Sequence, residues 1–121
     1  MILMAKTFMK QGEIWQINLD PSIGSEMKKS RPALLINVDS LGKLPLKIIV
    51  PITDWKEHYI DYPWMVKIIP SKQNGLSKIS AVDCFQIRCV SVERFAAPVG
   101  IASSEIILHV QEAIAQVIGI W

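Results

Sequence analysis

Ionisable and hydroxyl side chains gather directly before one apolar run of the sequence. The stretch GSEMKKSRPALLINV, residues 24–38, holds Ser25, Glu26, Lys28, Lys29 and Arg31. A guanidinium can hold two phosphate oxygens at once, and lysines attract a polyanion as point charges. A carboxylate nearby can assist the deprotonation of a hydroxyl. The segment from residue 20 to residue 31 is therefore a polar, locally basic lip at the mouth of the core, with the residue types that can bind a phosphate. A surface arginine that flanks a strand is the alternative reading of Arg31.

Composition limits how far this charge extends. The chain has 121 residues, half of them hydrophobic, which predicts one folded domain with a single core. A net charge of +2 does not by itself indicate a nucleic-acid-binding protein. Because only Lys28, Lys29 and Arg31 form a dense basic group, we expect a local basic patch rather than a basic face.

The first residues do not resemble a targeting segment. MILMAKTFMKQGE has no basic start, and Lys6 interrupts its apolar run, so it fits neither a secretory signal nor a membrane-spanning helix. We interpret residues 1–11 as a flexible extension and residues 12–121 as a single domain. The cytoplasm is the expected location.

The cysteines and histidines do not predict a metal site. Cys84 and Cys89 are five residues apart in one expected strand and would lie on opposite faces, where they cannot easily form a disulfide. Together with His58 and His109 they also lack zinc-ligand spacing. We expect structural thiols.

Most of the chain is patterned as short strands. The expected strands are EIWQINL (13–19), PALLINV (32–38), KIIVPI (47–52), WMVKII (64–69) and the long run SAVDCFQIRCVSV (80–92). An Asn74-Gly75 pair indicates a turn before the last of them. This spacing predicts a mainly β fold, a small barrel or tightly curved antiparallel sheet.

The end of the chain changes to helical periodicity. Ser103 or Ser104 can cap a helix whose apolar residues recur at three and four: Ile106, Val110, Ala113, Ile114, Val117 and Trp121. We predict one amphipathic helix docked on the sheet. Ile107 and Ile118 widen its apolar stripe, which indicates either deep packing or a shared subunit interface.

Several motifs in order give the chain a family resemblance. GEIWQINLDPSIGSEMKKSRPALLI resembles the start of the MazF/PemK/Kid toxin endoribonucleases, with the pattern G-[DE]-[IL]-W, a D-P turn, G-[SH]-E, and R-P before an apolar strand. VPIT (50–53) is similar to the strand of that family that ends in threonine, and QIRCV (86–90) to its Q-[IV]-[KR] strand. The resemblance covers nearly the whole chain after residue 11.

The resemblance implies a β-barrel of the CcdB/PemK plasmid-maintenance-toxin type with a C-terminal helix. It also implies a homodimer that cuts single-stranded RNA without metal or cofactor and is inhibited by a MazE-like antitoxin. RNA supplies its own nucleophile, so the expected products carry a 2′,3′-cyclic phosphate and a 5′-hydroxyl.

By family position, Arg31 and Thr53 are the expected catalytic pair. We expect Arg31 to stabilise transition-state charge, with proton donation to the leaving alkoxide as an open addition, because a guanidinium is a poor base. Glu26 is the candidate for assisting deprotonation. Ser25 is a supporting donor, and Lys28 and Lys29 would draw in the RNA backbone.

Further RNA contacts are expected from two other segments. The predicted residues are Trp55, His58 and Tyr59 in the aromatic loop TDWKEHYIDYPW, whose rings can stack on bases, and Asp83, Gln86 and Arg88 around QIRCV. The chain departs from some members of the family, which have histidine in place of Ser25 and aspartate in place of Phe85. Asp83, expected on the same strand face as Phe85, is one substitute for that acid; a partner of a lysine is the other reading. The general base stays open.

Two other function classes remain. A CcdB-like toxin binds gyrase through its terminal helix and needs no arginine and threonine site, and a catalytically silent RNA-binding barrel needs no chemistry at all. The combination of Glu26, Arg31 and Thr53 favours the nuclease.

Overall fold

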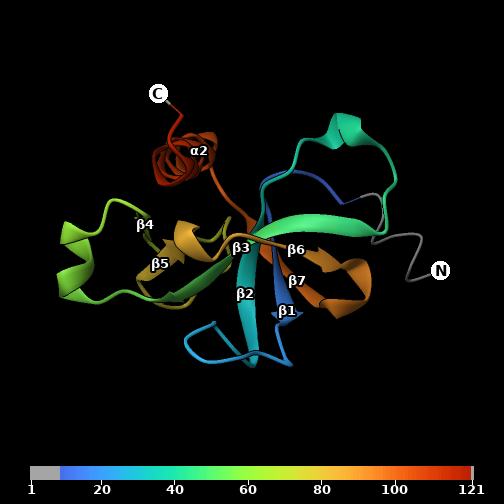
Figure 1. The fold of residues 1–121 in the computed structure, drawn as a ribbon, viewed down its shortest axis with the longest axis horizontal. Helices are drawn as coiled ribbons and strands as arrows, with labels where there is room; N and C mark the ends of the chain where they lie inside the picture. The colour runs from blue at the N-terminus through green and yellow to red at the C-terminus, as the bar shows by residue number, and fades with distance from the viewer. Residues whose placement is uncertain (1–8, 121) are drawn as a thin grey trace.

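The computed structural model describes residues 9–120, which form a curved antiparallel sheet and one covering helix (Figure 1). The strands are β1 (Glu13–Asn18), β2 (Ser30–Leu35), β3 (Leu46–Asp54), β4 (Met65–Ile68), β5 (Ser80–Asp83), β6 (Arg88–Ser91) and β7 (Phe95–Ile101), and the helix is α2 (Ser104–Ile118). Short 3-10 helices are η1 (Asp39–Leu41), η2 (Glu57–Asp61), η3 (Cys84–Gln86) and η4 (Val92–Arg94). The predicted small curved sheet with a C-terminal helix is confirmed.

Strand β3 joins the two halves of the sheet. Within residues 9–120, six of the seven strands follow the order β4-β5-β3-β2-β1-β7, and the seventh, β6, pairs with the first half of β3. The N-terminal part of β3 lies between β6 and β2, whereas Ile52, Thr53 and Asp54 of β3 pair with β5. Because β3 pairs with β6 at its start and with β5 at its end, the sheet bends along this strand and encloses the side chains of its inner face.

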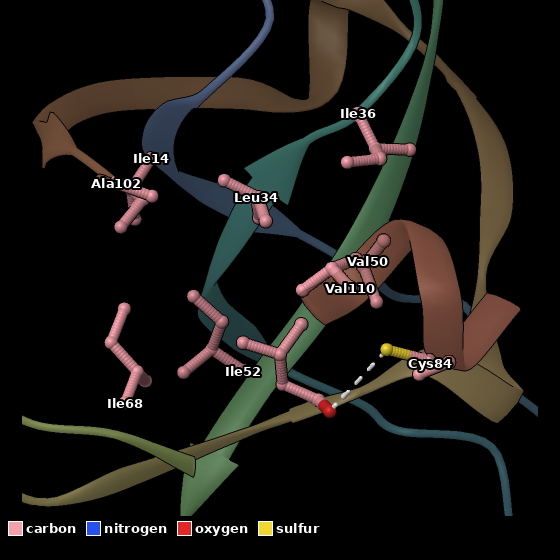
Figure 2. Close-up of a cluster of buried hydrophobic side chains, with 11 residues drawn as sticks. Ile14, Leu34, Ile36, Val50, Ile52, Ile68, Cys84, Ala102 and Val110 are labelled. Carbon is pink, nitrogen blue, oxygen red and sulfur yellow. Dashed lines mark hydrogen bonds between the residues drawn. The ribbon is translucent and has the colours of Figure 1, made fainter. Parts of the chain in front are cut away.

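Both faces of the central strands are buried, in two separate clusters. Leu34 packs with Ile14, Val50 and Val110 beneath α2 (Figure 2), whereas its neighbours Ala33 and Leu35 pack in a second cluster. Alternate residues of a strand point to opposite faces, so one continuous apolar run supplies both clusters. This explains why PALLI lacks the alternation of a half-exposed strand.

Helix α2 has clear signals at each end. The hydroxyl of Ser103 accepts the N–H of Ile106 at 3.2 Å, and Gly119 ends the helix with a left-handed φ of 82°. Val110 and Ala113 are buried against the sheet. Trp121, predicted to extend the stripe, lies outside the described residues.

Two predictions about the second half of the chain were wrong. The run 80–92 is not one strand, because Asp83 accepts the N–H of Phe85 and begins η3, which separates β5 from β6. Asp83 and Phe85 therefore do not share a strand face: Asp83 is buried and Phe85 exposed. Strand β7, absent from the prediction, pairs with β1 at the edge of the sheet. Cys84 and Cys89 lie in different elements and both are free thiols.

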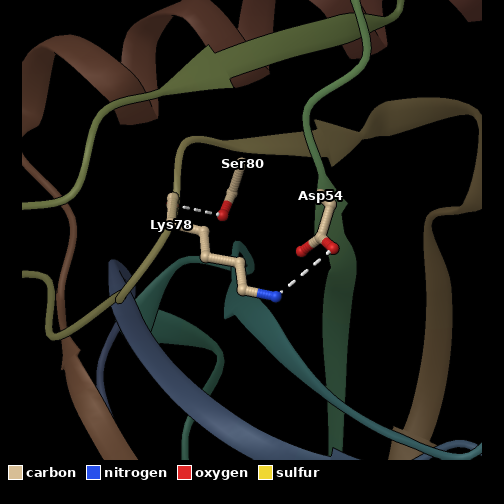
Figure 3. Close-up of polar contacts among 3 residues, drawn as sticks. All are labelled: Asp54, Lys78 and Ser80. Carbon is tan, nitrogen blue, oxygen red and sulfur yellow. Dashed lines mark hydrogen bonds and ion pairs between the residues drawn. The ribbon is translucent and has the colours of Figure 1, made fainter.

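Residues near the ends of the elements close the fold. Most of the predicted N-terminal extension lies outside the described residues, but Met9 is buried and the backbone N–H of Gln11 donates to Asp39 at 2.7 Å. The predicted turn at Gly75 is present with a φ of 71°, and a Cβ there would collide with the carbonyl oxygen of Val99. The ion pair between Asp54 and Lys78 is exposed and contributes little to stability (Figure 3).

Candidate active site

The loop between β1 and β2, residues 19–29, is held by hydrogen bonds within the loop and from Arg94 of η4. The carboxylate of Asp20 accepts the N–H of Lys29 at 3.1 Å, and Lys29 has a left-handed φ of 69°. The guanidinium of Arg94 donates to the backbone carbonyls of Asn18 and Asp20. The β1–β2 loop, which forms the lower edge of the molecule in Figure 1, is thus a defined structure at the predicted lip.

Gln86 connects this loop to the rest of the sheet. Its side-chain carbonyl accepts the N–H of Met27 at 2.5 Å, and its amide donates to Asp83 at 3.2 Å. Asp83 also accepts the N–H of Phe85 at 3.1 Å. An ionised carboxylate only accepts hydrogen bonds, so Asp83 orients the Gln86 amide with its carbonyl toward Met27.

An open pocket lies between the β1–β2 loop and the segment that follows β5. Its volume is about 450 Å³, within the range of ligand-binding pockets. It is lined by Ser25, Glu26, Met27, Pro51, Phe85, Gln86, Ile87 and Arg88. Four predicted residues, Ser25, Glu26, Gln86 and Arg88, are therefore brought together from separate parts of the chain.

Polar groups of the pocket are oriented by backbone contacts. Glu26 accepts the N–H of Ile23 at 2.6 Å, which holds its carboxylate over its own loop. Arg88 donates to the carbonyl of Leu19 at 3.3 Å. The pocket thus combines a carboxylate, which can accept a proton from an attacking hydroxyl, with a guanidinium, which can stabilise negative charge on a phosphate.

Arg31 and Thr53 lie outside the pocket lining but on the same face of the sheet. Pro51 lines the pocket and pairs with Ala33 on the neighbouring strand. Ala33 lies two residues after Arg31, and Pro51 lies two residues before Thr53. Side chains two residues apart share a strand face, so Arg31 lies on the face of Ala33, and Thr53 lies on the face of the pocket residue Pro51. Arg31 donates from Nε to the carbonyl of Lys28 at 3.2 Å, which directs its guanidinium along the loop. Lys28 and Lys29 are exposed.

The aromatic loop forms a chain of rings rather than a row of free ones. Trp55 meets Tyr59 edge to face, His58 contacts Tyr59 and Tyr62, and Tyr62 stacks on Trp64 with centroids 4.8 Å apart. The Lys67 ammonium lies 5.0 Å from the centre of the Trp55 ring. Trp55, His58 and Tyr59 are thus packed around η2, and the structure does not bring them to the pocket.

Burial changes the acidity of two neighbouring groups. Asp83 is 5% exposed, and its burial raises the pKa of the carboxyl although hydrogen bonds from Phe85 and Gln86 act in the opposite direction. Burial, together with the charge of Asp83, raises the pKa of the Cys84 thiol to about 12. Asp83, predicted to contact RNA, faces the interior, and its contacts hold Gln86.

Phe85 belongs to the pocket but was not among the predicted site residues. Phe85 is 64% exposed, and its ring lies edge to face against Trp64, with centroids 5.8 Å apart. The sequence does carry a signal, the aromatic side chain where some members of the resembling family have aspartate. Among residues 9–120 there is no cluster of His, Cys, Asp or Glu that could hold a metal and no helix long and apolar enough to span a membrane.

Comparison with known proteins places the chain in a family. Residues 10–118 match the family described as PemK-like, MazF-like toxin of type II toxin-antitoxin systems. The chain is 29% identical to endoribonuclease MazF9 of Mycobacterium tuberculosis, over 93% of this chain and 98% of the relative.

Solved structures share the fold. The MazF structure from Deinococcus radiodurans superposes with a TM-score of 0.77 at 23% identity, covering 93% of this chain and 98% of that one. An endoribonuclease in complex with its cognate antitoxin from a mycobacterial species superposes with a TM-score of 0.72 at 15% identity, over 92% and 95% of the two chains. The family match spans nearly all the described residues, and the chain belongs to the PemK-like, MazF-like toxins of type II toxin-antitoxin systems.

Proposed function

We propose that the protein is a sequence-specific, metal-independent endoribonuclease toxin that cuts single-stranded RNA in the cytoplasm. The observation that carries the proposal is membership of the PemK-like, MazF-like family over residues 10–118. A relative that this chain matches over almost its full length is named an endoribonuclease. The pocket beside the β1–β2 loop supports the same activity, since it gathers a carboxylate and a guanidinium on the face that carries Arg31 and Thr53.

The proposed reaction is an internal transesterification. The 2′-hydroxyl of one nucleotide attacks the adjacent phosphorus, the bond from phosphorus to the 5′-oxygen breaks, and a 2′,3′-cyclic phosphate forms. The 2′-hydroxyl proton passes to a base, and the departing 5′-oxygen takes a proton to become a hydroxyl. Position and charge stabilisation supply most of what such a reaction needs.

Each candidate residue has a distinct part in this scheme. Arg31 binds the phosphate oxygens with its terminal amino groups and stabilises the charge that grows on them. Thr53 donates its hydroxyl to a phosphate oxygen. Glu26, at the pocket and oriented by the N–H of Ile23, assists removal of the 2′-proton. Lys28 and Lys29, both exposed, attract the RNA backbone.

Incubation of the purified protein with a long RNA in EDTA tests the activity. We expect discrete fragments with 5′-hydroxyl and 2′,3′-cyclic phosphate ends, and sequencing of the 5′ ends would give the cleavage motif. Intact RNA that is nevertheless bound would favour a silent RNA-binding barrel. Intact RNA without binding, together with inhibition of gyrase, would favour a CcdB-like toxin.

The proposal includes a two-fold homodimer. An apolar groove between α2 and the β2–β3 side of the sheet offers a surface that a second copy would cover. It is lined mainly by Ile36, Val38, Leu41, Ile48, Ile87, Ile114, Ile118 and Ile120. Light scattering at micromolar concentration should give twice the mass of one chain, 13.6 kDa. A monomeric mass would contradict the dimer.

A MazE-like antitoxin is the proposed inhibitor. One structure with the same fold holds an endoribonuclease with its cognate antitoxin, and the β1–β2 loop here presents exposed Lys28 and Lys29. An acidic, disordered antitoxin tail would pair with these charges and block access to the pocket. If RNA cleavage continues undiminished in a complex with the cognate antitoxin, this part of the proposal is wrong.

A further inference from the structure

Phe85 holds an aromatic ring in solvent at the edge of the pocket. The residue is 64% exposed, and it lines the same pocket as Glu26 and Arg88. Single exposed apolar side chains are common, so exposure alone assigns no role. What distinguishes Phe85 is that three contacts, one of them made by the neighbouring Cys84, fix its position.

The backbone of η3 and the neighbouring rings hold Phe85 in place. Its N–H donates to Asp83 at 3.1 Å, and the N–H of the preceding Cys84 donates to the carbonyl of Trp64 at 2.9 Å. The Phe85 ring meets Trp64 edge to face at 5.8 Å, and Trp64 in turn stacks on Tyr62 at 4.8 Å with 12° between the planes. Trp64 therefore supports the Phe85 ring, while much of the Phe85 side chain is exposed to solvent.

The groups around Phe85 fit a nucleobase. A base has a flat π-face that stacks on an aromatic ring and an edge of donors and acceptors that polar side chains can bind. Ser25 and Arg88 line the pocket beside the ring; the Ser25 hydroxyl can donate to or accept from such an edge, and the Arg88 guanidinium can donate to it.

The apolar groove beneath α2 is a better surface for a protein partner than the pocket is. Aliphatic side chains dominate that groove, and Ile87 lines both sites. The pocket, by contrast, places one aromatic ring beside two charged and two polar residues, Glu26, Arg88, Ser25 and Gln86, although Met27, Pro51 and Ile87 also line it. This division favours RNA at Phe85 and protein at the groove.

We propose that Phe85 stacks on one base of the RNA substrate, beside the bond that is cut, and so determines which base the protein prefers at that position. The inference rests on the proposed endoribonuclease function. When a base stacks on a ring that is held at the rim of the pocket, the adjacent phosphate is positioned for the reaction. An RNA whose base stacks well is therefore cut faster than one whose base stacks poorly.

Three variants separate stacking from other roles. Phe85→Leu removes the π-face but keeps an apolar side chain, and Phe85→Tyr keeps the face. Ile69→Ala is the matched control, because Ile69 is 58% exposed and lies beyond the end of β4, outside this pocket. Circular dichroism and thermal melting would verify that each variant folds.

The first readout is cleavage of a mixed RNA pool, with mapping of the 5′ ends. For Phe85→Leu we expect roughly tenfold slower cutting at preferred sites and a weakened preference at one base position beside the cut, with the rest of the motif retained. Phe85→Tyr and Ile69→Ala should reproduce the parental pattern. An unchanged pattern and rate in Phe85→Leu would overturn the inference while leaving the endoribonuclease function in place.

The second readout does not depend on cleavage. Short 2′-O-methyl RNAs cannot be cut by attack of a 2′-hydroxyl, and 2-aminopurine placed in turn at each position loses fluorescence when it stacks on a ring. The parental protein should quench one position strongly and Phe85→Leu should not. If the parental protein quenches a base but cuts no RNA, the proposed function fails and the stacking site remains. Absence of quenching, or a change of subunit mass in Phe85→Leu with the base preference intact, would assign Phe85 to another role and overturn the proposal.

Discussion

The side-chain carbonyl of Gln86 accepts a hydrogen bond from the backbone N–H of Met27 at 2.5 Å, across 59 positions of sequence. Met27 follows Glu26 directly, so this contact fixes the segment that carries the proposed general base. Asp83 holds the other end of the Gln86 amide at 3.2 Å. We therefore propose Gln86 as a positioning residue that affects the reaction through the β1–β2 loop.

Gln86→Leu should loosen the β1–β2 loop without disturbing the core. The variant leaves the N–H of Met27 without its acceptor, and we expect amide hydrogen exchange at Met27 to accelerate in the absence of RNA. We also expect RNA cleavage to fall by about tenfold to a hundredfold, mainly in kcat, because a small displacement of a reacting group is costly.

Gln86→Glu is the matched control for this prediction. It keeps an acceptor for Met27 but replaces the donor to Asp83 with a second carboxylate, so it should protect Met27 better than Gln86→Leu does. If Gln86→Leu instead weakens RNA binding while Met27 exchange stays slow, Gln86 contacts RNA directly and does not hold the loop.

The buried carboxyl of Asp83 should make stability depend on pH in a defined direction. Burial raises its pKa above the ordinary aspartate value of 3.8, so the folded protein keeps this proton to a higher pH than the unfolded chain does. Its contribution to stability is full below 3.8 and is lost as the pH rises through the folded pKa. The free energy of unfolding, measured in urea relative to Asp83→Asn, should therefore fall as the pH rises from 3.8. A rise over that window would mean that the hydrogen bonds from Phe85 and Gln86 outweigh burial.

Elements with a strong local pattern could be predicted from the sequence. The continuous apolar run around Leu34 predicts a strand buried on both faces, and the three-and-four spacing after Ser103 predicts α2. Strand β7 gave no such signal, because FAAPVGI contains Pro98, Gly100 and small residues. Proline is tolerated there because β7 is an edge strand.

Local side-chain chemistry and distant contacts were harder to predict. The apolar pattern of residues 80–92 continues through the point where Asp83 accepts the N–H of Phe85, and this hydrogen bond ends the strand. The pocket joins residues 25–27 with Pro51 and residues 85–88, so its composition depends on the register of β2 and β3. Family resemblance supplied four of its residues, whereas the exposure of Phe85 required the structure.

The two cysteines should react at very different rates. Cys84 is buried, its thiol donates to the carbonyl of Val82 at 3.8 Å, and its pKa is raised to about 12, so it carries little of the reactive thiolate at neutral pH. Cys89 is exposed. A thiol reagent such as Ellman's should therefore label one cysteine rapidly in the native protein and the second only on unfolding. Cys89→Ser should abolish the rapid phase; its persistence would show that Cys84 is accessible.

Arg31, Lys28 and Lys29 should fail in different ways when they are replaced, because the first lies on a strand and the other two in the exposed loop before it. Arg31→Ala should leave the fold intact and lower the single-turnover cleavage rate on the order of 10²-fold or more, as loss of a preorganised charge contact does. Arg31→Lys should not restore the rate, since an ammonium cannot bind two phosphate oxygens as a planar fork.

Lys28→Ala and Lys29→Ala should weaken RNA binding instead, with an effect that shrinks as salt screens the attraction. Thr53→Val, which removes one hydroxyl at nearly constant shape, should cost less than Arg31→Ala. Rates on a short RNA at two salt concentrations would separate these cases, and a near-parental rate for Arg31→Ala would show that Arg31 has no part in the chemistry.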